Sequence, residues 1–103
     1  MRYSLYGNSE PPVIEWDEKK EQLNFQKHGI RFKTAAKILL DPNLLIREDV
    51  AHSKEVRYNI IGKAGKVLFA VITIPKKNTI RIISARLAVR SEKELYYHES
   101  IEP

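Results

Sequence analysis

Apolar residues recur at helical spacing in the N-terminal part of the chain. Asp17 is a good N-cap for a helix over 18–27, because its carboxylate can accept hydrogen bonds from the free amides of the first turn. Gly29 is the natural residue to end that helix, since glycine readily adopts the left-handed conformation found there. At about 100° per residue, three apolar residues fall on the side that we expect to be buried: Trp16, Leu23 and Ile30. The polar edge beside them carries Lys20, Asn24, Lys27 and His28.

A second helix is predicted directly after the first. Its apolar positions follow the spacing of one buried helix face: Phe32, Ala35, Ala36, Leu39 and Leu40. The pair Asp41-Pro42 ends it, because proline cannot continue a helix. The start of this helix is poorly capped, since Arg31 stands where Ser, Thr or Asp is usual.

From residue 44 onward the pattern changes to short β-branched runs. Strands are predicted over 44–46, 57–61, 67–74 and 79–85, with hairpin turns at 62–65 and 75–78. The run 67–74 is apolar at nearly every residue, which is typical of a central strand covered on both faces. Helix resumes at Ser91, which can form a capping box with Glu94. Residues 13–16 are either a further short strand or an apolar lead-in.

These elements predict an α+β fold in which the helices are segregated from the sheet. We expect two N-terminal helices, a curled, mainly antiparallel sheet of about four strands, and a C-terminal helix. At 103 residues the chain has the usual size of one hydrophobic core, which we assign to residues 13–103. Residues 1–12 are predicted to be an N-terminal extension, because Pro11-Pro12 forces the chain into an extended conformation.

Charge and composition narrow the classes of function. Lys and Arg number 18 against 13 Asp and Glu, and the resulting net charge of +5 favours polyanionic partners, above all nucleic acid. The lack of cysteine excludes a disulfide framework, a thiolate zinc site and cysteine catalysis. No apolar run approaches the roughly 20 residues of a membrane span, and the first residues lack the apolar stretch of a signal peptide. We therefore expect a cytoplasmic protein without membrane association.

Short motifs follow one another through most of the chain. They are Trp16-Asp17-Glu18-x-Lys20, Asn24, Lys27-His28-Gly29-Ile30-x-Phe32, Asp41-Pro42, His52-Ser53-x-Glu55-x-Arg57, Ile61-Gly62, Arg81-Ile82-Ile83-Ser84-Ala85-Arg86, and Glu92 with Tyr96. In this order and at these spacings they resemble the BrnT family of ribonuclease toxins from type II toxin-antitoxin systems. Arg31 departs from the small hydroxyl cap usual in that family, and the N-terminal extension is unusual for it.

The resemblance implies a RelE-like toxin fold and metal-independent cleavage of RNA, which would inhibit translation. It also implies a cognate antitoxin with a ribbon-helix-helix DNA-binding domain, so that operator DNA would be bound only through the antitoxin. The three histidines have no spacing that suggests a metal site, and no glycine-rich loop suggests a nucleotide cofactor. We therefore expect neither a metal nor a cofactor.

Metal-independent RNA cleavage needs a base for the 2′-hydroxyl proton, cations for the pentavalent phosphorane, and an acid for the leaving 5′-oxygen. Arginine suits the second task, because its planar fork binds two phosphate oxygens and stays charged. Arg86 ends the last predicted strand and Arg57 begins another, so we expect both to reach one phosphate. The alternatives are that Arg86 lies over the sheet edge, and that Arg57 forms an ion pair with Glu55 or Glu92.

Two histidines are candidate acid–base groups. His28 lies near a helix C-terminus, which favours imidazolium, so it could donate a proton or contact a phosphate. The alternative is that His28 only stabilises the helix dipole. His52 lies in a polar loop and would act as a base if Glu55 or Asp49 orients it.

Tyr96 is a further catalytic candidate, since it could protonate a leaving group or stack on a base, although its spacing suits helix packing equally well. The basic residues that we expect to contact RNA are Lys20, Lys27, Arg81 and Arg90. For Lys20 and Lys27 the alternative is a solvated helix edge. Asn24 and Ser84 are interpreted as structural, with Asn24 tying its helix to a neighbouring loop.

The leading interpretation is an endoribonuclease toxin that is neutralised by an antitoxin. The alternative is a non-catalytic module of the same fold that binds RNA, or an acidic protein partner, through the same basic face. A DNA-binding repressor is less favoured, because no helix-turn-helix turn is recognisable in the sequence.

Overall fold

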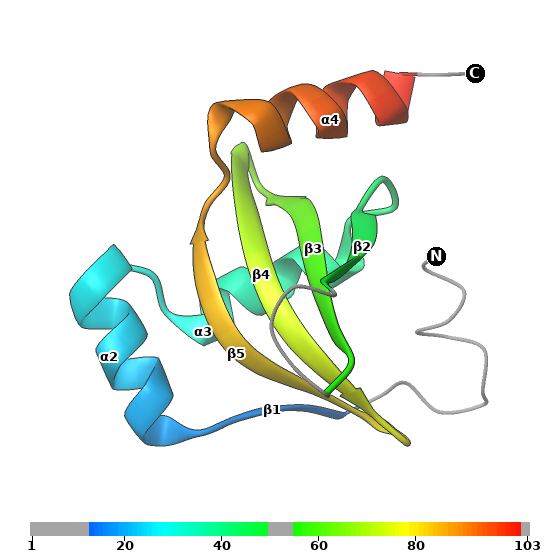
Figure 1. Cartoon of the computed structure of the whole chain (residues 1–103). Coiled ribbons are helices and arrows are strands. Elements are labelled where there is room, and N and C mark those ends of the chain that lie inside the picture. Colours follow the sequence, from blue (N-terminus) through cyan, green and yellow to red (C-terminus); the bar gives the residue numbers. More distant parts are fainter. Residues whose placement is uncertain (1–12, 50–54, 102–103) are drawn as a thin grey trace.

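The computed structural model describes residues 13–49 and 55–101, and the predicted extension over residues 1–12 lies outside them (Figure 1). The elements in chain order are β1 (Val13–Trp16), α2 (Glu18–His28), α3 (Phe32–Ala35), the 3₁₀-helix η1 (Ala36–Leu40), β2 (Leu45–Asp49), β3 (Arg57–Ala64), β4 (Val67–Lys76), β5 (Thr79–Leu87) and α4 (Arg90–Ile101). The fold is α+β, as predicted. Within these residues, no helix combines the length and the apolar composition that a bilayer crossing requires.

The sheet has five strands in the order β1-β5-β4-β3-β2, one more than predicted. The additional strand is β1, which pairs in parallel with β5, while the other neighbouring strands are antiparallel. β1 has only four residues, and so short a segment shows too little alternation of apolar and polar residues to distinguish a strand from an apolar lead-in. The parallel pairing with a distant strand decides between the two alternatives.

β4 occupies the centre of the sheet, and its residues from Leu68 to Val71 are buried, as its apolar run predicts. On one face, α3 and η1 lie behind the sheet in Figure 1 and enclose the main core. Its most deeply buried residues include Phe32, Ala35, Ile38, Val71, Ile82 and Ala85. On the opposite face, a smaller cluster joins the sheet to α4: Ile61, Leu68, Ala88 and Tyr96.

The second predicted helix is shorter and more tightly wound than its apolar spacing indicated. Only Phe32–Ala35 is α-helical, and Ala36–Leu40 continues as a 3₁₀-helix. The buried side chains of this segment are Phe32 and Ala35 in the α-helical part and Ile38 and Leu39 in the 3₁₀ part, where the turn tightens to three residues. The prediction that Leu40 is buried was wrong, since it is 74% exposed.

The predicted turn at 62–65 was wrong in its position, because Gly62 lies inside β3. The turn follows at residues 65–66, where Gly65 has a φ of 65°, a conformation that glycine adopts without steric cost. Gly62 is required for a different reason. A Cβ atom at this position would lie 2.9 Å from the Cβ of Ile38, so η1 packs on β3 at a place without a side chain.

α2 contacts the sheet through polar side chains. Asp17 caps its start as predicted, accepting a hydrogen bond from a first-turn amide at 3.0 Å, and Gly29 ends it with a φ of 71°. The buried positions, however, are Glu21 and Asn24, whereas Leu23 is 64% exposed. The predicted apolar stripe through Leu23 was therefore wrong.

Asn24 attaches α2 to the sheet. Its Nδ2 donates to the carbonyl oxygens of Ile30 at 3.1 Å and Ala85 at 2.9 Å, and its Oδ1 accepts from the Ala85 amide at 3.1 Å. These bonds confirm the structural interpretation of Asn24 and add β5 as its main partner. The helix is thereby held at a fixed position along β5, the strand that carries Arg86.

The weak start of α3 is capped from α2. Arg31 makes no side-chain cap, as predicted, and the Phe32 amide donates instead to the Glu21 carboxylate at 3.2 Å. The Arg31 guanidinium lies 3.9 Å from the centre of the Phe25 ring and 3.6 Å from Glu21. A tertiary contact thus replaces the local cap that the sequence lacks.

α4 begins at Arg90, and its cap differs from the prediction. The residue before the helix is Val89, whose amide donates to Glu92 Oε1 at 2.9 Å. Glu92 therefore takes the position in the capping box that was predicted for Glu94, while Ser91 lies inside the first turn. Valine has no side-chain acceptor, so only the glutamate half of the box can form.

Replacing Asn24 by alanine should lower the free energy of unfolding by about 2–3 kcal/mol, because buried amide and carbonyl groups of Ala85 would lose their partner. Urea unfolding measures this change through the fluorescence of Trp16, the only tryptophan, which contacts the Phe32 ring edge-on. Gln26→Ala, on the exposed side of the same helix, is the matched control. Equal effects of the two substitutions would contradict the role given to Asn24.

Candidate functional site

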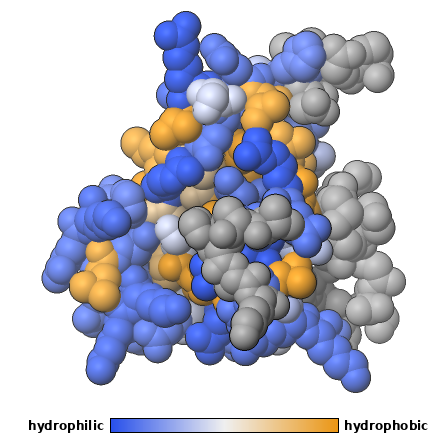
Figure 2. Space-filling model, in the orientation of Figure 1, coloured by the Kyte–Doolittle hydropathy of each residue, from blue (hydrophilic) through white to orange (hydrophobic). Residues whose placement is uncertain are grey.

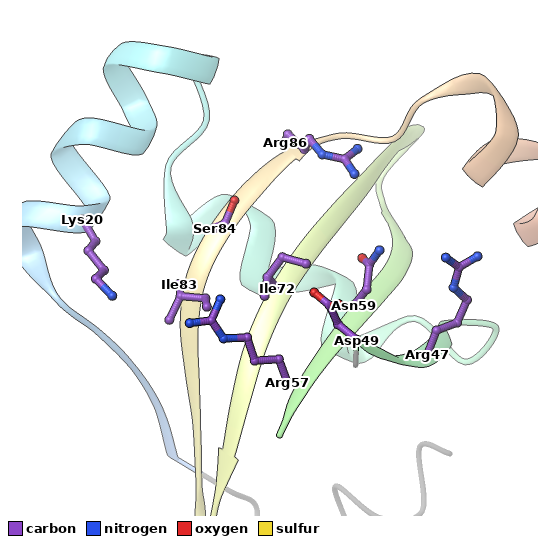
Figure 3. Close-up of a pocket in the computed structure, with 9 residues that line it drawn as sticks. All are labelled: Lys20, Arg47, Asp49, Arg57, Asn59, Ile72, Ile83, Ser84 and Arg86. Carbon is purple, nitrogen blue, oxygen red and sulfur yellow. The ribbon is translucent and has the colours of Figure 1, made fainter. Parts of the chain in front are cut away.

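A cleft opens on the sheet face opposite α3 (Figure 3). It encloses about 540 Å³, which is within the range of small-ligand sites. Its described lining comes from α2 and four strands: Lys20, Arg47, Asp49, Arg57, Asn59, Ile72, Ile83, Ser84 and Arg86. Four of these side chains are basic and one is acidic, so the described part of the cleft attracts anions.

The floor of the cleft is a row of direct neighbours across the sheet. The row runs through β2, β3, β4 and β5 and consists of Arg47, Asn59, Ile72 and Ser84. Directly opposite residues project from the same face of a sheet, which brings these four side chains together. Asp49 and Arg57 form the next pair on that face, and in Figure 3 the Arg57 side chain extends from β3 across β4 toward β5.

A β-bulge in β5 turns Arg86 toward the cleft. The pairing of β4 with β5 shifts by one residue at Ile83, which has no partner of its own. Ile82 and Ala85, three residues apart, consequently both point into the main core with 0% exposure. With regular alternation Arg86 would share a face with Ile82 and would point into that core. The bulge therefore decides on which face the arginine lies.

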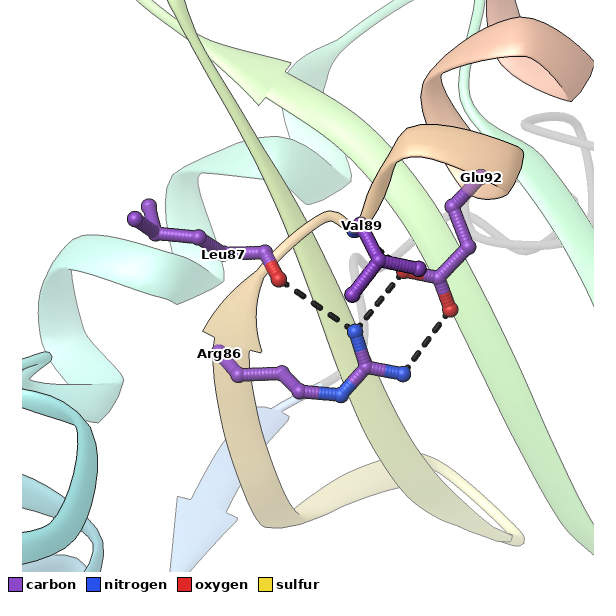
Figure 4. A network of polar contacts seen from close by, with 4 residues as sticks. All are labelled: Arg86, Leu87, Val89 and Glu92. Atoms are coloured by element: carbon purple, nitrogen blue, oxygen red, sulfur yellow. Dashed lines mark hydrogen bonds and ion pairs between the residues drawn. The ribbon is translucent and has the colours of Figure 1, made fainter.

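Arg86 is held by a bidentate ion pair (Figure 4). Its Nη1 and Nη2 donate to the two carboxylate oxygens of Glu92, both at 2.8 Å, and Nη1 also donates to the Leu87 carbonyl. The Glu92 carboxylate accepts further hydrogen bonds from the Val89 amide and the Asn59 side chain. The hydrogen bonds between Arg86 and Glu92 lower the pKa of the carboxyl and raise the pKa of the guanidinium. Both groups are therefore charged at neutral pH, and Arg86 lines the cleft with its charge largely neutralised.

Arg57 forms a weaker ion pair than Arg86 does. Its Nη2 lies 3.9 Å from a carboxylate oxygen of Glu55, whose side chain is 56% exposed, and such a pair contributes little to stability. Of the two ion pairs predicted as alternatives for Arg57, the one with Glu55 forms in this weak geometry, while Glu92 pairs with Arg86. The Nε–H of Arg57 and the Oδ1 of Asn59 are buried and find no hydrogen-bond partner in the described part of the chain. Buried polar atoms without partners cost free energy, so the cleft keeps unused hydrogen-bonding capacity.

A smaller hollow adjoins the cleft along α2. It encloses about 210 Å³. Its described lining is Lys20, Leu23, Asn24, Lys27, His28, Ile83 and Ser84. Lys20, Ile83 and Ser84 line both spaces, so the cleft and this α2 hollow lie side by side.

The structure brings together part of the predicted site. The cleft receives Lys20, Arg57 and Arg86, and the α2 hollow receives Lys27 and His28. His52 lies outside the described residues, so its role as a base stays a prediction.

Three predicted site residues lie away from both spaces. Tyr96 is 3% exposed, and its hydroxyl donates to Asp41 at 2.7 Å. Burial, together with the hydrogen bond to Asp41, raises the pKa of Tyr96, and its surroundings fit the alternative of helix packing. Arg81 pairs with Glu15 at 2.9 Å, and the 93% exposed side chain of Arg90 lies beside a carboxylate of its own helix.

The sequence reasoning missed several residues of the cleft. Asn59 follows Arg57 by two residues, so strand alternation alone could have placed both on one face. Arg47 and Asp49 were assigned to a polar connection, because charged residues are a poor signal for a strand. Pairing with β3 extends β2 through both of them. Ser84, interpreted as structural, lines both the cleft and the α2 hollow.

Polar residues dominate the face of the molecule that carries the cleft. In Figure 2 they cover most of α2 and the tip of the β4–β5 hairpin, while apolar residues reach the surface beside α4. Among residues 13–49 and 55–101, no three His, Asp or Glu side chains are grouped as metal ligands would be. The described cleft thus brings four basic side chains and one carboxylate, that of Asp49, to the same space.

Glu92→Gln should destabilise the protein at neutral pH much more than at acid pH. The pKa of Glu92 is lowered by folding, so its stabilisation is present above the unfolded value of about 4.3 and is lost as the pH falls through the folded value. Because the Arg86 side chain is 35% exposed and partly screened, we expect a loss of about 1–2 kcal/mol at neutral pH.

Urea unfolding between about pH 3 and pH 7 measures this difference. Glu94→Gln is the matched control, since Glu94 lies on the same helix in an exposed pair with Arg90, and it should unfold like the wild type. A deficit in Glu92→Gln that does not shrink on acidification would show that the ionised carboxylate is not what stabilises this corner.

Comparison with known proteins identifies the family of the chain. A family model described as the ribonuclease toxin BrnT of type II toxin-antitoxin systems matches residues 16–92. The matched region contains every described residue that lines the cleft, and also Glu92. A comparison with curated proteins found no match. The chain belongs to the BrnT family of type II toxin-antitoxin ribonuclease toxins, as its motifs predicted.

Proposed function

We propose that the protein is a metal-independent endoribonuclease whose cleft binds a phosphate of RNA and cleaves the chain beside it. The observation that supports this most directly is the cluster of four basic side chains in the cleft of a chain from a ribonuclease toxin family. Basic side chains bind RNA phosphates and stabilise the charge that develops on the phosphorane. They can therefore supply the charge stabilisation that metal ions provide in other nucleases.

Arg57 is the cation that we assign to the reacting phosphate. Its Nε–H has no acceptor in the described structure, and its contact with Glu55 is long enough to be exchanged readily for a phosphate. Arg86 is the second contact. Glu92 occupies its outer nitrogens, so the Nε side of the guanidinium is the part left for the substrate.

Proton transfer is assigned to Asp49 and Lys20, which line the same cleft. Asp49 lies opposite Arg57 in the β2–β3 pair and takes the proton of the 2′-hydroxyl. The 2′-oxygen attacks phosphorus, the bond from phosphorus to the 5′-oxygen breaks, and the Lys20 ammonium gives the leaving oxygen its proton. The products are a 2′,3′-cyclic phosphate and a 5′-hydroxyl end. His52, the base predicted from the sequence, is the alternative to Asp49.

Cleavage of cellular RNA would inhibit translation until an antitoxin neutralises the protein. A type II toxin family implies such a partner. We further propose that the antitoxin carries a ribbon-helix-helix domain and that operator DNA is bound only through it.

A second function is favoured by the neutralised state of Arg86. An arginine whose outer nitrogens are held by Glu92 can help to position a phosphate without taking up the charge of a transition state. The cleft would then bind RNA without cutting it.

Purified protein should cleave single-stranded RNA in EDTA and leave 2′,3′-cyclic phosphate ends. Arg57→Ala should lower kcat/KM by a factor on the order of 100–1000, because the reacting phosphate loses its main cation. Asp49→Asn should lower kcat by at least about 100-fold while KM stays near the wild-type value, as expected when only proton transfer is removed. End-labelled RNA resolved on gels measures these values.

Lys33→Ala is the control for these variants, since Lys33 is exposed on α3 and lines neither the cleft nor the α2 hollow. Salt-dependent binding of RNA that stays intact would establish the non-catalytic alternative. Loss of cleavage in EDTA would contradict metal independence. Full activity of Arg57→Ala would contradict the phosphate assignment.

A further inference from the structure

The α2 hollow continues the cleft beyond the residues assigned to cleavage. Lys20, Ile83 and Ser84 form the boundary between the two spaces and line both of them. In Figure 3 the Lys20 side chain projects from α2 toward β5, on the side of Ile83. Because the two spaces share these residues, a strand of RNA whose reacting phosphate lies at Arg57 and Arg86 would pass Lys20 to reach the α2 hollow.

The chemistry of the α2 hollow suits one nucleotide. Lys27 and His28 supply basic groups, and Ser84 supplies a hydroxyl that can donate or accept a hydrogen bond. Leu23 adds an apolar surface that is 64% exposed. Lys20, Leu23 and Lys27 are spaced three and four residues apart, so they lie along one strip of the helix surface.

The floor of the α2 hollow is rigid. Asn24 also lines this hollow. Its side-chain amide forms hydrogen bonds with the backbone of Ile30 and Ala85. This residue cannot turn toward a ligand without breaking those bonds. It therefore fixes the shape of the α2 hollow relative to β5.

We propose that the α2 hollow is a subsite for the nucleotide that flanks the cleaved linkage. Lys27 and His28 contact its phosphate, Leu23 packs against its base or sugar, and Lys20 contacts the phosphate shared with the cleft. This inference rests on the proposed function, because it takes RNA as the ligand of the cleft. It adds a second nucleotide to the site and thereby makes affinity depend on the length of the substrate.

A simpler role for Lys27 and His28 is to stabilise the C-terminus of α2, whose carbonyl groups carry a partial negative charge. That role needs neither the exposed Leu23 nor the shared boundary with the cleft. The same partial charge would repel an anion, so a phosphate can lie here only if both basic side chains face it. The two roles therefore predict different effects of removing Lys27 and His28 on RNA binding.

The test uses 2′-O-methyl oligonucleotides, which cannot be cleaved, in lengths from about two to about eight nucleotides. Their affinities are measured by fluorescence anisotropy at several salt concentrations. For the wild type, affinity should increase as the strand becomes long enough to enter the α2 hollow. In Lys27→Gln/His28→Gln this gain from length should fall about tenfold, and the slope of log K against log salt for the long strands should decrease by about 1.

Lys33→Gln/Lys37→Gln is the matched control, since it removes two exposed cations from α3 and η1, outside both spaces. It should keep the gain from length. Leu23→Ala should reduce that gain without changing the salt slope, because it removes apolar contact and no charge. Urea unfolding of each variant checks that α2 is intact.

Retention of the gain in Lys27→Gln/His28→Gln, or an equal loss in the control, would overturn the subsite. Loss of antitoxin binding in Lys27→Gln/His28→Gln with the gain retained would also overturn it, and would assign the α2 hollow to a protein partner. If wild-type protein cleaves RNA but the gain is insensitive to Lys27 and His28, only this inference fails. If it binds RNA with the expected gain but never cleaves, the subsite stands and the catalytic proposal fails.

Discussion

The geometry of the cleft depends on one buried carboxylate, that of Glu92. It binds the fork of Arg86 at the end of β5, accepts the Val89 amide at the start of α4, and receives the side chain of Asn59 from β3. A carboxylate is costly to bury unless its oxygens are satisfied, so these partners are not independent of one another. The group that starts α4 is therefore also the group that sets the positions of Arg86 and Asn59. A change at the start of α4 would therefore alter the positions of side chains in the cleft.

Because of this ion pair, Arg86 and Arg57 differ in how much of their charge is available to a ligand. Glu92 largely neutralises Arg86, so the attraction of the described cleft for anions comes mainly from its other basic side chains, reduced by Asp49. Arg57 has only a weak pair with Glu55, and its Nε–H finds no acceptor among the residues that the structure describes, so it is the more available of the two. Such unsatisfied groups are rare in folded proteins and concentrate where a ligand can complete them. The main core on the other face of the sheet can offset their cost.

Local signals predicted the parts of the fold that are held by local interactions. The Asp17 cap, the Gly29 terminus and the apolar run of β4 could all be read from neighbouring residues, and Arg57 and Arg86 stood out at predicted strand ends within the motif series. The missed features depend on pairing between distant segments: the parallel partner of β1, the extension of β2 by β3, and the bulge at Ile83. Sequence spacing also placed the capping glutamate two residues too late, because it took Ser91 as the cap.

The exposed face of α2 could not be predicted from the sequence, because polar side chains attach this helix to the rest of the fold. An amphipathic helix usually buries its apolar stripe, but this one is attached through Asn24 and Glu21, which bond to backbone groups of β5 and α3. Directional hydrogen bonds fix the rotation of the helix about its axis more narrowly than apolar contact does, since a rotated amide would lose them. That rotation leaves Leu23 exposed and directs Lys20 toward β5. A helix rotated to bury Leu23 would carry Lys20 away from the cleft, so the polar attachment of α2 is a requirement of the site.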